Sequence, residues 1–399
     1  MEDSKFLRAA VAGDLAMRDL EETMDAAFSE TALAPIKELL EKADLRMLNL
    51  ETPIPPEGME HIEKSGAILH AVPKNLAFLK AGGFQCATLA NNHIGDFGDE
   101  GVANTLRLLD EWGFAHTGAG LNDRQARAPF IFEKNGLRLG VLARAETEFG
   151  IADTEKPGAA AMLLPRMFED MRALREKVDF LLVVLHGGNE YNPLPSPDVK
   201  ERYRLIARFG ADAVIAMHPH CPQGYEIFEG VPIVYSTGNF LFHKFFGEDT
   251  DPHSSWYYGY LPLLTFSRGA PVKLEIHPYR FDPDCRQITP FKGEEKEKML
   301  RYLEEISAAF QDDERHRRLF RGWTTIAGPG YANSMKWEER YLTDPQFAKR
   351  QEMLALRNLW TCQAHNELMR VLSVSANEGL LEDARTAAEE VRRLQRMPV

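Results

Sequence analysis

Short apolar segments alternate with amphipathic segments along the first half of the chain. Five apolar runs are long enough to form buried strands, at residues 6–12, 45–50, 84–90, 178–185 and 213–217. Segments with apolar residues at helical spacing precede or follow them, at 35–43, 73–79, 100–112, 165–177 and 197–209. Strands and helices that alternate in this way favour parallel pairing. The pattern therefore predicts an α/β fold with strands buried on both faces.

Two hairpins extend this pattern. Residues 129–143 alternate around Asn135-Gly136, a strong signal for a two-residue turn. Residues 261–267 and 272–279 are typical of an antiparallel pair that closes the sheet.

The last quarter of the chain has a different, charged and helical character. The pattern predicts a helix over 292–313, an irregular stretch over 322–344 and helices around 346–373 and 378–396. An apolar stripe on the last helix consists of Leu380, Ala384, Ala387, Val391 and Leu394. We expect this stripe to pack in the core, with a homodimer or lid contact as the alternative. We expect one domain over 1–285 and a helical extension over 286–399. The extension would pack on the first domain or cover it as a lid.

Polar residues with metal-binding side chains follow the apolar runs. They are Asp14, Glu51, Asn92, His93, His186, His218 and His220. Ligand sites in α/β proteins form just beyond the carboxyl ends of strands, so these side chains are expected to meet there. His218 and His220 would point the same way if the chain between them were extended. Alone they could equally be loop histidines that bond to backbone, but the other strand ends favour a site. Oxygen and nitrogen donors in this mixture suit one or two divalent ions, such as Mn, Fe or Zn.

Composition narrows the range of partners and compartments. Hydrophobic residues make up 44% of the 399 residues, which is ample for a core, and the net charge is −13 without a basic cluster. Nucleic acid is therefore not an expected partner. The four cysteines (Cys86, Cys221, Cys285 and Cys362) show no paired spacing, which fits a reduced compartment. Because no apolar leader or membrane-length segment is present, we expect a cytoplasmic protein without a membrane span.

Six short motifs occur in an order that resembles a known family. They are Gly13-Asp14, Asn49-Leu-Glu51, Ala90-Asn-Asn-His93 followed by Gly95-Asp-Phe-Gly98, His186-Gly-Gly-Asn-Glu190, His218-Pro-His220 and Tyr235-Ser-Thr-Gly-Asn-Phe240. This order resembles the CapA family of poly-γ-glutamate capsule-synthesis proteins, which is similar in fold to the calcineurin-like metallophosphatases. The resemblance covers residues 6–245 and leaves out the helical tail.

The resemblance implies a fold and a set of roles. The fold is a layered α/β sandwich of the calcineurin-like metallophosphatase type, with the helical tail as an extension. Asp14 and His220 would hold one metal ion, Asn92, His186 and His218 the other, and Glu51 would bridge them. His93 would be the proton donor, so that His93, Asp14 and Glu51 form the catalytic group. Glu190, Asn239 and Asn91 would line the substrate pocket, with a turn role as the alternative for Asn239.

One departure from the metallophosphatase pattern concerns the metal ligands. Those phosphatases usually carry a histidine two residues after the first aspartate, and Ala16 stands there in this chain. One ion site is therefore expected to lack one ligand. That site would bind its ion weakly, have an open coordination position or be empty. A degenerate site without any metal is the alternative.

Three functions remain open on this basis. The first is a metal-dependent hydrolase or transferase of capsule or poly-γ-glutamate metabolism. Its substrate would be an anionic small molecule, peptide or poly-acid that contains an amide or phosphate. The second is a metal-independent epimerase that uses Asp14, Glu51, His93 and His220 as acids and bases. The third is a non-catalytic component of an exopolymer synthesis complex, with the helical tail as its docking surface.

Overall fold

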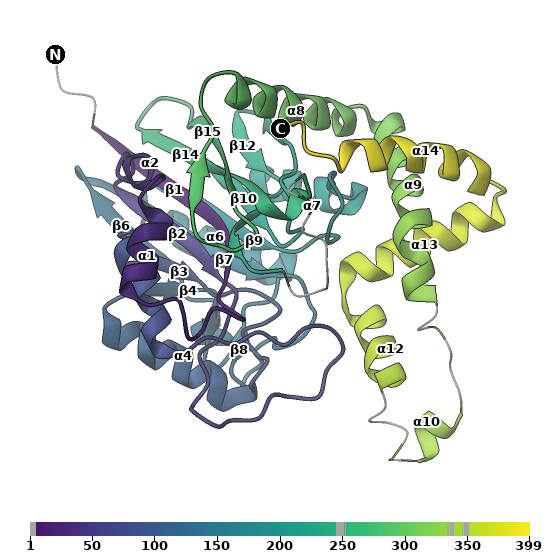
Figure 1. Cartoon of the computed structure of the whole chain (residues 1–399), viewed down its shortest axis with the longest axis horizontal. Helices are drawn as coiled ribbons and strands as arrows, with labels where there is room; N and C mark the ends of the chain where they lie inside the picture. Colours follow the sequence, from purple (N-terminus) through teal and green to yellow (C-terminus); the bar gives the residue numbers. More distant parts are fainter. Residues whose placement is uncertain are drawn as a thin grey trace.

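Two β-sheets stacked face to face form the body of the molecule (Figure 1). The computed structural model describes residues 5–244, 251, 253–332, 335, 339–344, 346 and 351–399. The first sheet contains β1 (Phe6–Ala16), β2 (Leu45–Leu50), β3 (Cys86–Thr88), β4 (Ala115–Thr117), β13 (Asn239–Phe242), β14 (Tyr258–Ser267), β15 (Lys273–Phe281) and β16 (Ile288–Pro290). The second contains β6 (Phe130–Lys134), β7 (Leu137–Ala145), β9 (Phe180–His186), β10 (Ala213–Met217), β11 (Tyr225–Phe228) and β12 (Val231–Val234). A small ribbon of β5 (Ala119–Gly120) and β8 (Gly158–Ala159) lies beside them.

The strand order places parallel strands at the centre of both sheets. The first sheet runs β16-β15-β14-β1-β2-β3-β4, with β13 also paired to β1, and the second runs β11-β12-β10-β9-β7-β6. Pairing is parallel from β1 through β4 and from β7 through β9 to β10 and β12. Asp14, Glu51, His186 and His218 lie at or next to the carboxyl ends of these parallel strands, which therefore bring them to one edge of the sandwich. The predicted α/β sandwich is confirmed.

Both predicted hairpins are present. β6 and β7 turn on Asn135 and Gly136, whose φ angles of 55° and 72° are those of a two-residue hairpin turn. β14 and β15 pair antiparallel and extend the first sheet beyond β1.

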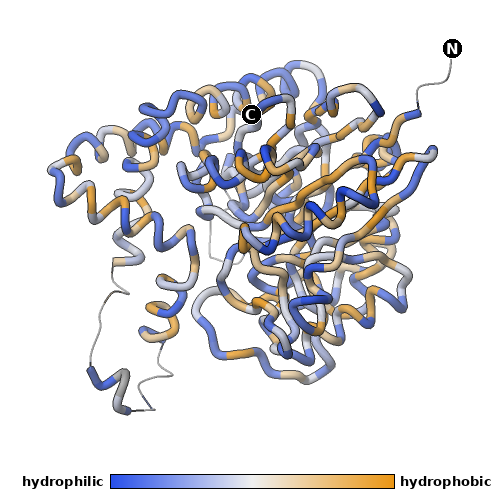
Figure 2. Tube along the Cα trace, turned by 180° about the vertical axis from the view of Figure 1, so that it is seen from behind, coloured by the Kyte–Doolittle hydropathy of each residue, from blue (hydrophilic) through white to orange (hydrophobic). Residues whose placement is uncertain are grey.

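Helices cover the outer faces of the sheets and shield their apolar strands from solvent (Figures 1 and 2). They are α1 (Ala26–Leu33), α2 (Lys37–Leu40), η1 (Pro73–Leu76), α3 (Ala77–Ala81), α4 (Gly98–Trp112), α5 (Asp123–Ala126), α6 (Leu164–Arg175), α7 (Pro197–Arg208) and η2 (Ser255–Tyr257). The helix predicted over 35–43 is only the single turn α2, so this prediction was too long. The start of α7 follows its sequence signal, because Ser196 accepts a hydrogen bond from the Val199 backbone and Pro197 takes the first position.

The C-terminal helical extension is confirmed, but its outline differs from the prediction. It contains α8 (Gly293–Gln311), α9 (Asp313–Ala332), α10 (Arg340–Thr343), α12 (Gln351–Thr361), α13 (Gln363–Asn377) and α14 (Leu381–Leu394). The helix predicted over 346–373 is divided at Cys362, whose ψ of 123° interrupts the helix; residues 345 and 347–350 lie outside the described residues. The apolar stripe of α14 packs against α9, as expected for core.

The irregular stretch predicted over 322–344 is wrong for 322–332 and 340–343, which are helical. Glycine usually weakens a helix, but two glycines of α9 allow close packing. A Cβ on Gly322 would lie 2.7 Å from the backbone of Ala387, and one on Gly328 would lie 2.5 Å from the Leu372 side chain. Pro329 falls in the last turn of α9, where it removes one backbone donor, and the helix ends three residues later at Ala332. Residues 333, 334 and 336–338 lie outside the described residues.

The loop that follows β9 is held by the helical extension. The Asn189 Nδ2 donates to the Ala364 carbonyl at 3.1 Å, and the Gln395 Nε2 donates to the Tyr191 carbonyl at 2.9 Å. His316 Nε2 lies 2.7 Å from the Pro195 carbonyl oxygen. These contacts place α9 and α13 beside the edge where the parallel strands end. None of the described helices combines the length and apolar character that crossing a bilayer requires.

A glycine at the end of β1 sets the position of the strand that carries Asp14. A Cβ on Gly13 would lie 1.8 Å from the carbonyl oxygen of Gly238, on the segment leading into β13. We expect Gly13→Ala to lower the free energy of unfolding by about 1–3 kcal/mol or more, because backbone must move to relieve the overlap. Urea denaturation measures this. The control is Gly330→Ala in α9, where no atom lies within 4 Å of the added Cβ and stability should stay equal or rise by up to about 1 kcal/mol. Equal stability of the Gly13→Ala and wild-type proteins would refute the packing argument.

Candidate functional site

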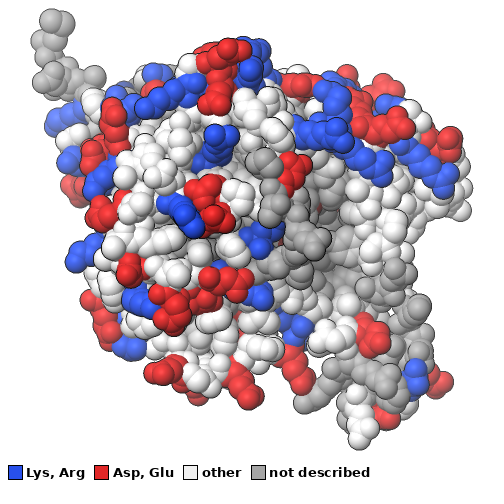
Figure 3. Space-filling view, viewed as in Figure 1, with Lys and Arg blue, Asp and Glu red and all other residues white. Residues whose placement is uncertain are grey.

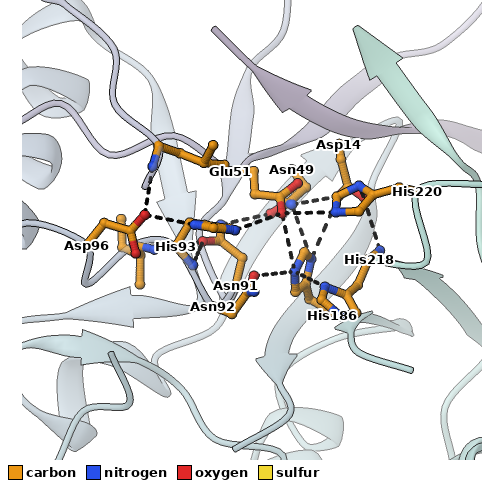
Figure 4. Close-up of polar contacts among 12 residues, drawn as sticks. Asp14, Asn49, Glu51, Asn91, Asn92, His93, Asp96, His186, His218 and His220 are labelled. Atoms are coloured by element: carbon orange, nitrogen blue, oxygen red, sulfur yellow. Dashed lines mark hydrogen bonds and ion pairs between the residues drawn. The ribbon is translucent and has the colours of Figure 1, made fainter. Parts of the chain in front are cut away.

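The predicted strand-end residues lie together at the edge where the two sheets meet (Figure 4). Asp14 lies two residues before the end of β1, Glu51 follows β2, and Asn92 and His93 follow β3. From the second sheet, His186 ends β9, and His218 and His220 follow β10. All seven side chains are buried. Residues distant in the sequence thus form one cluster.

Four side chains form a first group of metal-binding atoms, which we call the histidine-rich donor group (Glu51, Asn92, His186 and His218). His186 Nε2 lies 3.0 Å from Asn92 Oδ1, 3.0 Å from His218 Nδ1 and 3.8 Å from Glu51 Oε1. An ion bound tetrahedrally at about 2.0–2.2 Å has ligand atoms roughly 3.3–3.5 Å apart. The observed spacings surround this value, so the group could hold one divalent ion.

A second group, which we call the carboxylate-rich donor group, consists of Asp14, Glu51 and His220. His220 Nε2 lies 3.7 Å from Glu51 Oε1, and His220 Nδ1 lies 3.6 Å from Asp14 Oδ2. Candidate ligand atoms of the three residues all lie within 4.8 Å of one another. Glu51 belongs to both groups, as expected for a bridging ligand. This second group provides only three donors.

The Glu51 carboxyl gives the clearest test of whether a metal fits. Both of its oxygens are buried and have no hydrogen-bond partner among the residues that the structure describes. Burial, together with the charges of Asp14 and Glu190, raises the pKa of Glu51 well above its ordinary value. A buried carboxyl without a partner is costly, and a divalent cation supplies the missing partner. The donor set therefore fits a metal ion.

The protonation states of the other donors also suit metal binding. Burial lowers the pKa of His186 and of His218 well below the ordinary value and lowers the pKa of His220 to about 4. All three imidazoles are then neutral near pH 7, which is the form that binds metals. Burial raises the pKa of Asp14 to about 7, although the Asn49 amide and the His218 backbone N–H act in the opposite direction.

The histidine loop has an unusual backbone. The φ angles of His218 and His220 are 105° and 53°, in a region that side-chain-bearing residues rarely adopt. The expectation that the chain between the two histidines is extended is therefore wrong, although one ring nitrogen of each still lies within 4.8 Å of the other and of a Glu190 carboxylate oxygen. Asp14 Oδ2 accepts a hydrogen bond from the His218 backbone N–H at 3.0 Å and helps to hold this conformation. Such backbone strain concentrates at functional sites.

Three asparagines orient the donors. Asn49 Nδ2 donates to Asp14 Oδ1 at 2.7 Å and lies 3.3 Å from His186 Nδ1. Asn91 Nδ2 lies 3.2 Å from Asn49 Oδ1, and Asn91 Oδ1 accepts from the His93 backbone at 3.1 Å. Asn49 was not expected in the site, although it stands two residues before Glu51 in the same motif.

Asn239 plays the same orienting part for His220. Its Oδ1 lies 2.9 Å from His220 Nδ1, and its Nδ2 donates to the Trp256 carbonyl at 3.1 Å. With Nδ1 engaged, His220 directs Nε2 toward Glu51. Asn91 and Asn239 were both expected to line the substrate pocket, and the structure places their side chains, fully buried, behind the donors.

His93 is held by a buried ion pair. His93 Nδ1 lies 2.8 Å from Asp96 Oδ2, Lys64 Nζ contacts Asp96 Oδ1, and Lys64 Nζ lies 3.3 Å from His93 Nδ1. His93 Nε2 is 3.9 Å from Glu51 Oε1 and so faces the donors. Burial and the charge of Lys64 lower the pKa of His93. Asp96 could have been found from its spacing three residues after His93, whereas nothing in its sequence context marked Lys64.

A pocket of about 420 Å³ opens above the donors. Asn92, His93, Glu190 and His220 line it from the sandwich, and Tyr331, Asn358, Leu359 and His365 line it from the helical extension. Figure 3 shows the surface hollowed between these two parts of the molecule, with acidic and basic side chains interspersed around it. Glu190 was expected in a substrate pocket and does lie on its wall.

Comparisons with known proteins agree on one family. Residues 8–244, more than half of the chain, match the family model described as "Bacterial capsule synthesis protein PGA_cap". The chain is 27% identical over 251 residues to the capsule biosynthesis protein CapA of Bacillus anthracis, covering 61% of each chain. It is 25% identical over 242 residues to the PGA biosynthesis protein CapA of Bacillus subtilis (strain 168), covering 60% of this chain and 64% of that one. The chain thus spans less than two thirds of the length of these relatives.

Solved structures with some similarity include two nucleotidases. One is a 5'-nucleotidase precursor from Thermus thermophilus, with 13% identity and a TM-score of 0.39 over 77% of this chain and 60% of that one. The other is NAD nucleotidase (NadN) from Haemophilus influenzae, with 11% identity and a TM-score of 0.39 over 76% of this chain and 56% of that one. The family itself is established by the match over residues 8–244, and this chain belongs to the bacterial capsule synthesis protein (PGA_cap) family.

Proposed function

We propose that this protein is a metal-dependent hydrolase or transferase that acts on an amide-containing, anionic substrate in capsule or poly-γ-glutamate metabolism. The observation that supports this most directly is the Glu51 carboxyl, which is buried without a hydrogen-bond partner among the described residues and shared by two donor groups. The printed names of the relatives, capsule and PGA biosynthesis proteins, supply the metabolic context.

The chain's own residues would divide the work between holding ions and moving a proton. Asp14, Glu51, Asn92 and the three buried histidines would hold the ions, which when bound supply Lewis-acid polarisation of a carbonyl or phosphoryl oxygen. Asp96 accepts the hydrogen bond of His93 Nδ1, which leaves His93 Nε2 facing the donors to give or take a proton. Asn49, Asn91 and Asn239 would keep the donors in orientation.

The pocket favours an amide over a phosphate. Glu148 and Glu190 lie on its wall, and two carboxyls would repel a highly charged phosphate group. The pocket also contains a basic side chain, because Lys244 lines it. The Lys244 Nζ lies 5.8 Å from the centroid of the Trp256 ring. A substrate with amide N–H groups and a carboxylate matches this mixture of carboxyl and ammonium groups.

A metal-independent epimerase is the alternative on the same fold. It would need Glu51 as an acid or base, yet the structure gives the Glu51 oxygens no protein hydrogen-bond partner among the described residues. His186 and His218 would then have no role, although both point into the cluster. The metal-dependent function accounts for all of these residues.

The metal content of the purified protein is the first test. We expect one or two Mn, Fe or Zn ions per chain by elemental analysis, because two donor groups share Glu51. The double variant His186→Ala/His218→Ala should lose the ion of the histidine-rich donor group and all turnover of γ-glutamyl amide substrates. His253→Ala, an exposed histidine, should keep both. A protein that is metal-free and fully active would rule the proposal out.

Metal binding should release protons below about pH 7. The pKa of Asp14 is raised to about 7, so this carboxyl carries a proton near pH 6, and burial shifts the pKa of Glu51 in the same direction. The histidines are already neutral there, because burial lowers their pKa values. An ion must therefore displace protons from the carboxyls. For each displaced proton, its affinity should fall about tenfold for every unit by which the pH is lowered.

Calorimetric titration of the apoprotein with Zn²⁺ counts the protons released. The titration is done at about pH 6 and about pH 8.5, each in two buffers of different ionisation enthalpy. More protons should be released at the lower pH than at the higher one. An affinity that does not change over this range would contradict the assignment of protonated carboxyls.

The role of His93 can be separated from metal binding. His93→Gln removes the proton carrier and leaves every proposed metal ligand in place, so the metal content should not change. Turnover should fall by roughly 10²–10⁴-fold, the usual contribution of a general acid or base. The control is His116→Gln on β4, whose imidazole pairs with Asp110 at 3.1 Å outside the site. If His93→Gln retained full turnover, another residue would have to move the proton.

A further inference from the structure

The helical extension gives the pocket above the donors a wall that is polar but uncharged. As far as the structure describes the extension, the residues that line the pocket from it are Gly330, Tyr331, Ala355, Asn358, Leu359 and His365. Burial lowers the pKa of His365 to about 4, so its imidazole is neutral near pH 7. The sandwich side differs, because the carboxyls of Glu148 and Glu190 line the pocket there.

Two polar atoms of this wall lack a partner. Asn358 Oδ1 and His365 Nδ1 are buried and form no hydrogen bond in the part of the chain that the structure describes. The Asn358 side chain also hydrogen-bonds to the Glu148 carboxyl, and that bond engages its Nδ2, the donor atom of the amide. Oδ1 is thus left as an acceptor, whereas His365 Nδ1 can donate or accept. A ligand that satisfies both atoms removes the cost of leaving them unpaired.

The backbone of this wall is bound to the sandwich at two points. Ser65 Oγ donates to the Leu354 carbonyl of α12 at 3.4 Å. Asn189 Nδ2 donates at 3.1 Å to the carbonyl of Ala364, the residue before His365. Both helices that carry the unpartnered atoms are therefore fixed relative to the donors.

The side chains of the wall are also held in place. Asn358 and Leu359 follow Ala355 by three and four residues in α12, the spacing that puts side chains on one face of a helix. His365 lies in the first turn of α13, and its ring packs against Tyr331 with the ring centroids 4.5 Å apart. The two unpartnered atoms are thus presented to the pocket from ordered helices.

The wall also lies close to the proposed metal ligands. Glu148 hydrogen-bonds both to Asn358 and to Asn92 of the histidine-rich donor group, so a single carboxyl separates these two amides. His365 is near enough to His218 to contribute to the lowering of its pKa. One ligand molecule can therefore reach the donors and the wall at the same time.

We propose that Asn358 and His365 form an outer subsite that binds a second amide of the substrate, beside the amide that lies at the donors. A secondary amide offers an N–H, which Asn358 Oδ1 accepts, and a carbonyl oxygen, to which His365 Nδ1 donates. A carboxylate or a phosphate has no N–H and would leave Asn358 Oδ1 unpaired. The subsite rests on the proposed function and narrows its substrate class to acidic oligomers with at least two amides in series.

Binding of two ligands to the full-length protein as purified tests this subsite. A γ-linked glutamate trimer has two amides, whereas γ-glutamylglutamate, the dimer, has one. Tryptophan fluorescence after rapid mixing reports binding before cleavage, because Trp256 lines the pocket. Wild-type protein should bind the trimer about tenfold more tightly than the dimer, because only the trimer satisfies both unpartnered atoms.

His365→Phe removes the ring nitrogens and keeps an aromatic ring against Tyr331. It should bind the trimer about tenfold more weakly than the wild type and the dimer equally well. Asn358→Leu should show the same selective loss. Elemental analysis and thermal unfolding check that each variant keeps its metal content and its fold.

Asn366→Ala is the matched control, because Asn366 is exposed on α13 next to His365. It should bind both ligands as the wild type does. The subsite would be refuted if the wild type bound neither ligand or bound both equally, or if His365→Phe weakened both equally or neither. Cleavage of both ligands without a preference for the trimer would overturn the subsite alone. A trimer preference that His365→Phe abolishes, in a protein that cleaves neither ligand, would support the subsite and overturn the proposed function.

Discussion

The burial of one carboxyl group governs the structure of this protein's site. Glu51 lies between the two sheets with both oxygens shielded from water and without a hydrogen-bond partner among the described residues. The loss of hydration of such a group costs several kcal/mol unless a cation or donors replace the water. The neutral histidines around it bring nitrogen atoms but no positive charge. A cation would complete this arrangement, and the proposed metal binding would then contribute to the stability of this edge.

The fold holds the donors in place by joining the two sheets at this edge. Asp14 belongs to the first sheet, yet it accepts a hydrogen bond from the backbone of His218, which follows the second sheet. The same Asp14 carboxyl is bound by Asn49 of the neighbouring strand. Gly13 permits the close approach of the segment at Gly238 that leads to Asn239 and hence to His220. The proposed metal ligands and the packing therefore share the same few residues, and a change to one will affect the other.

The sequence predicted those parts that depend on local pattern. Apolar runs ending in polar residues predicted the strand ends, because parallel strands bring their carboxyl ends to one edge. Asn135-Gly136 predicted its hairpin because both residues tolerate positive φ. Features that depend on tertiary contact were missed: the glycines of α9 serve helix packing, and Lys64 reaches Asp96 from an irregular segment. Asn91 and Asn239 share the motifs of the site, but which way an asparagine points is decided by its hydrogen bonds.

The helical extension gives this chain a pocket wall that its family match does not include. The match ends at residue 244, yet Tyr331 and His365, whose ring centroids lie 4.5 Å apart, line the pocket together with Asn358. Asn358 Oδ1 and His365 Nδ1 are buried without a hydrogen-bond partner in the described part of the chain. Buried polar groups of this kind discriminate strongly between ligands that satisfy them and ligands that do not. The donor groups thus belong to the family-matched region, whereas the unpartnered polar atoms that a ligand in the outer part of the pocket would meet lie beyond it.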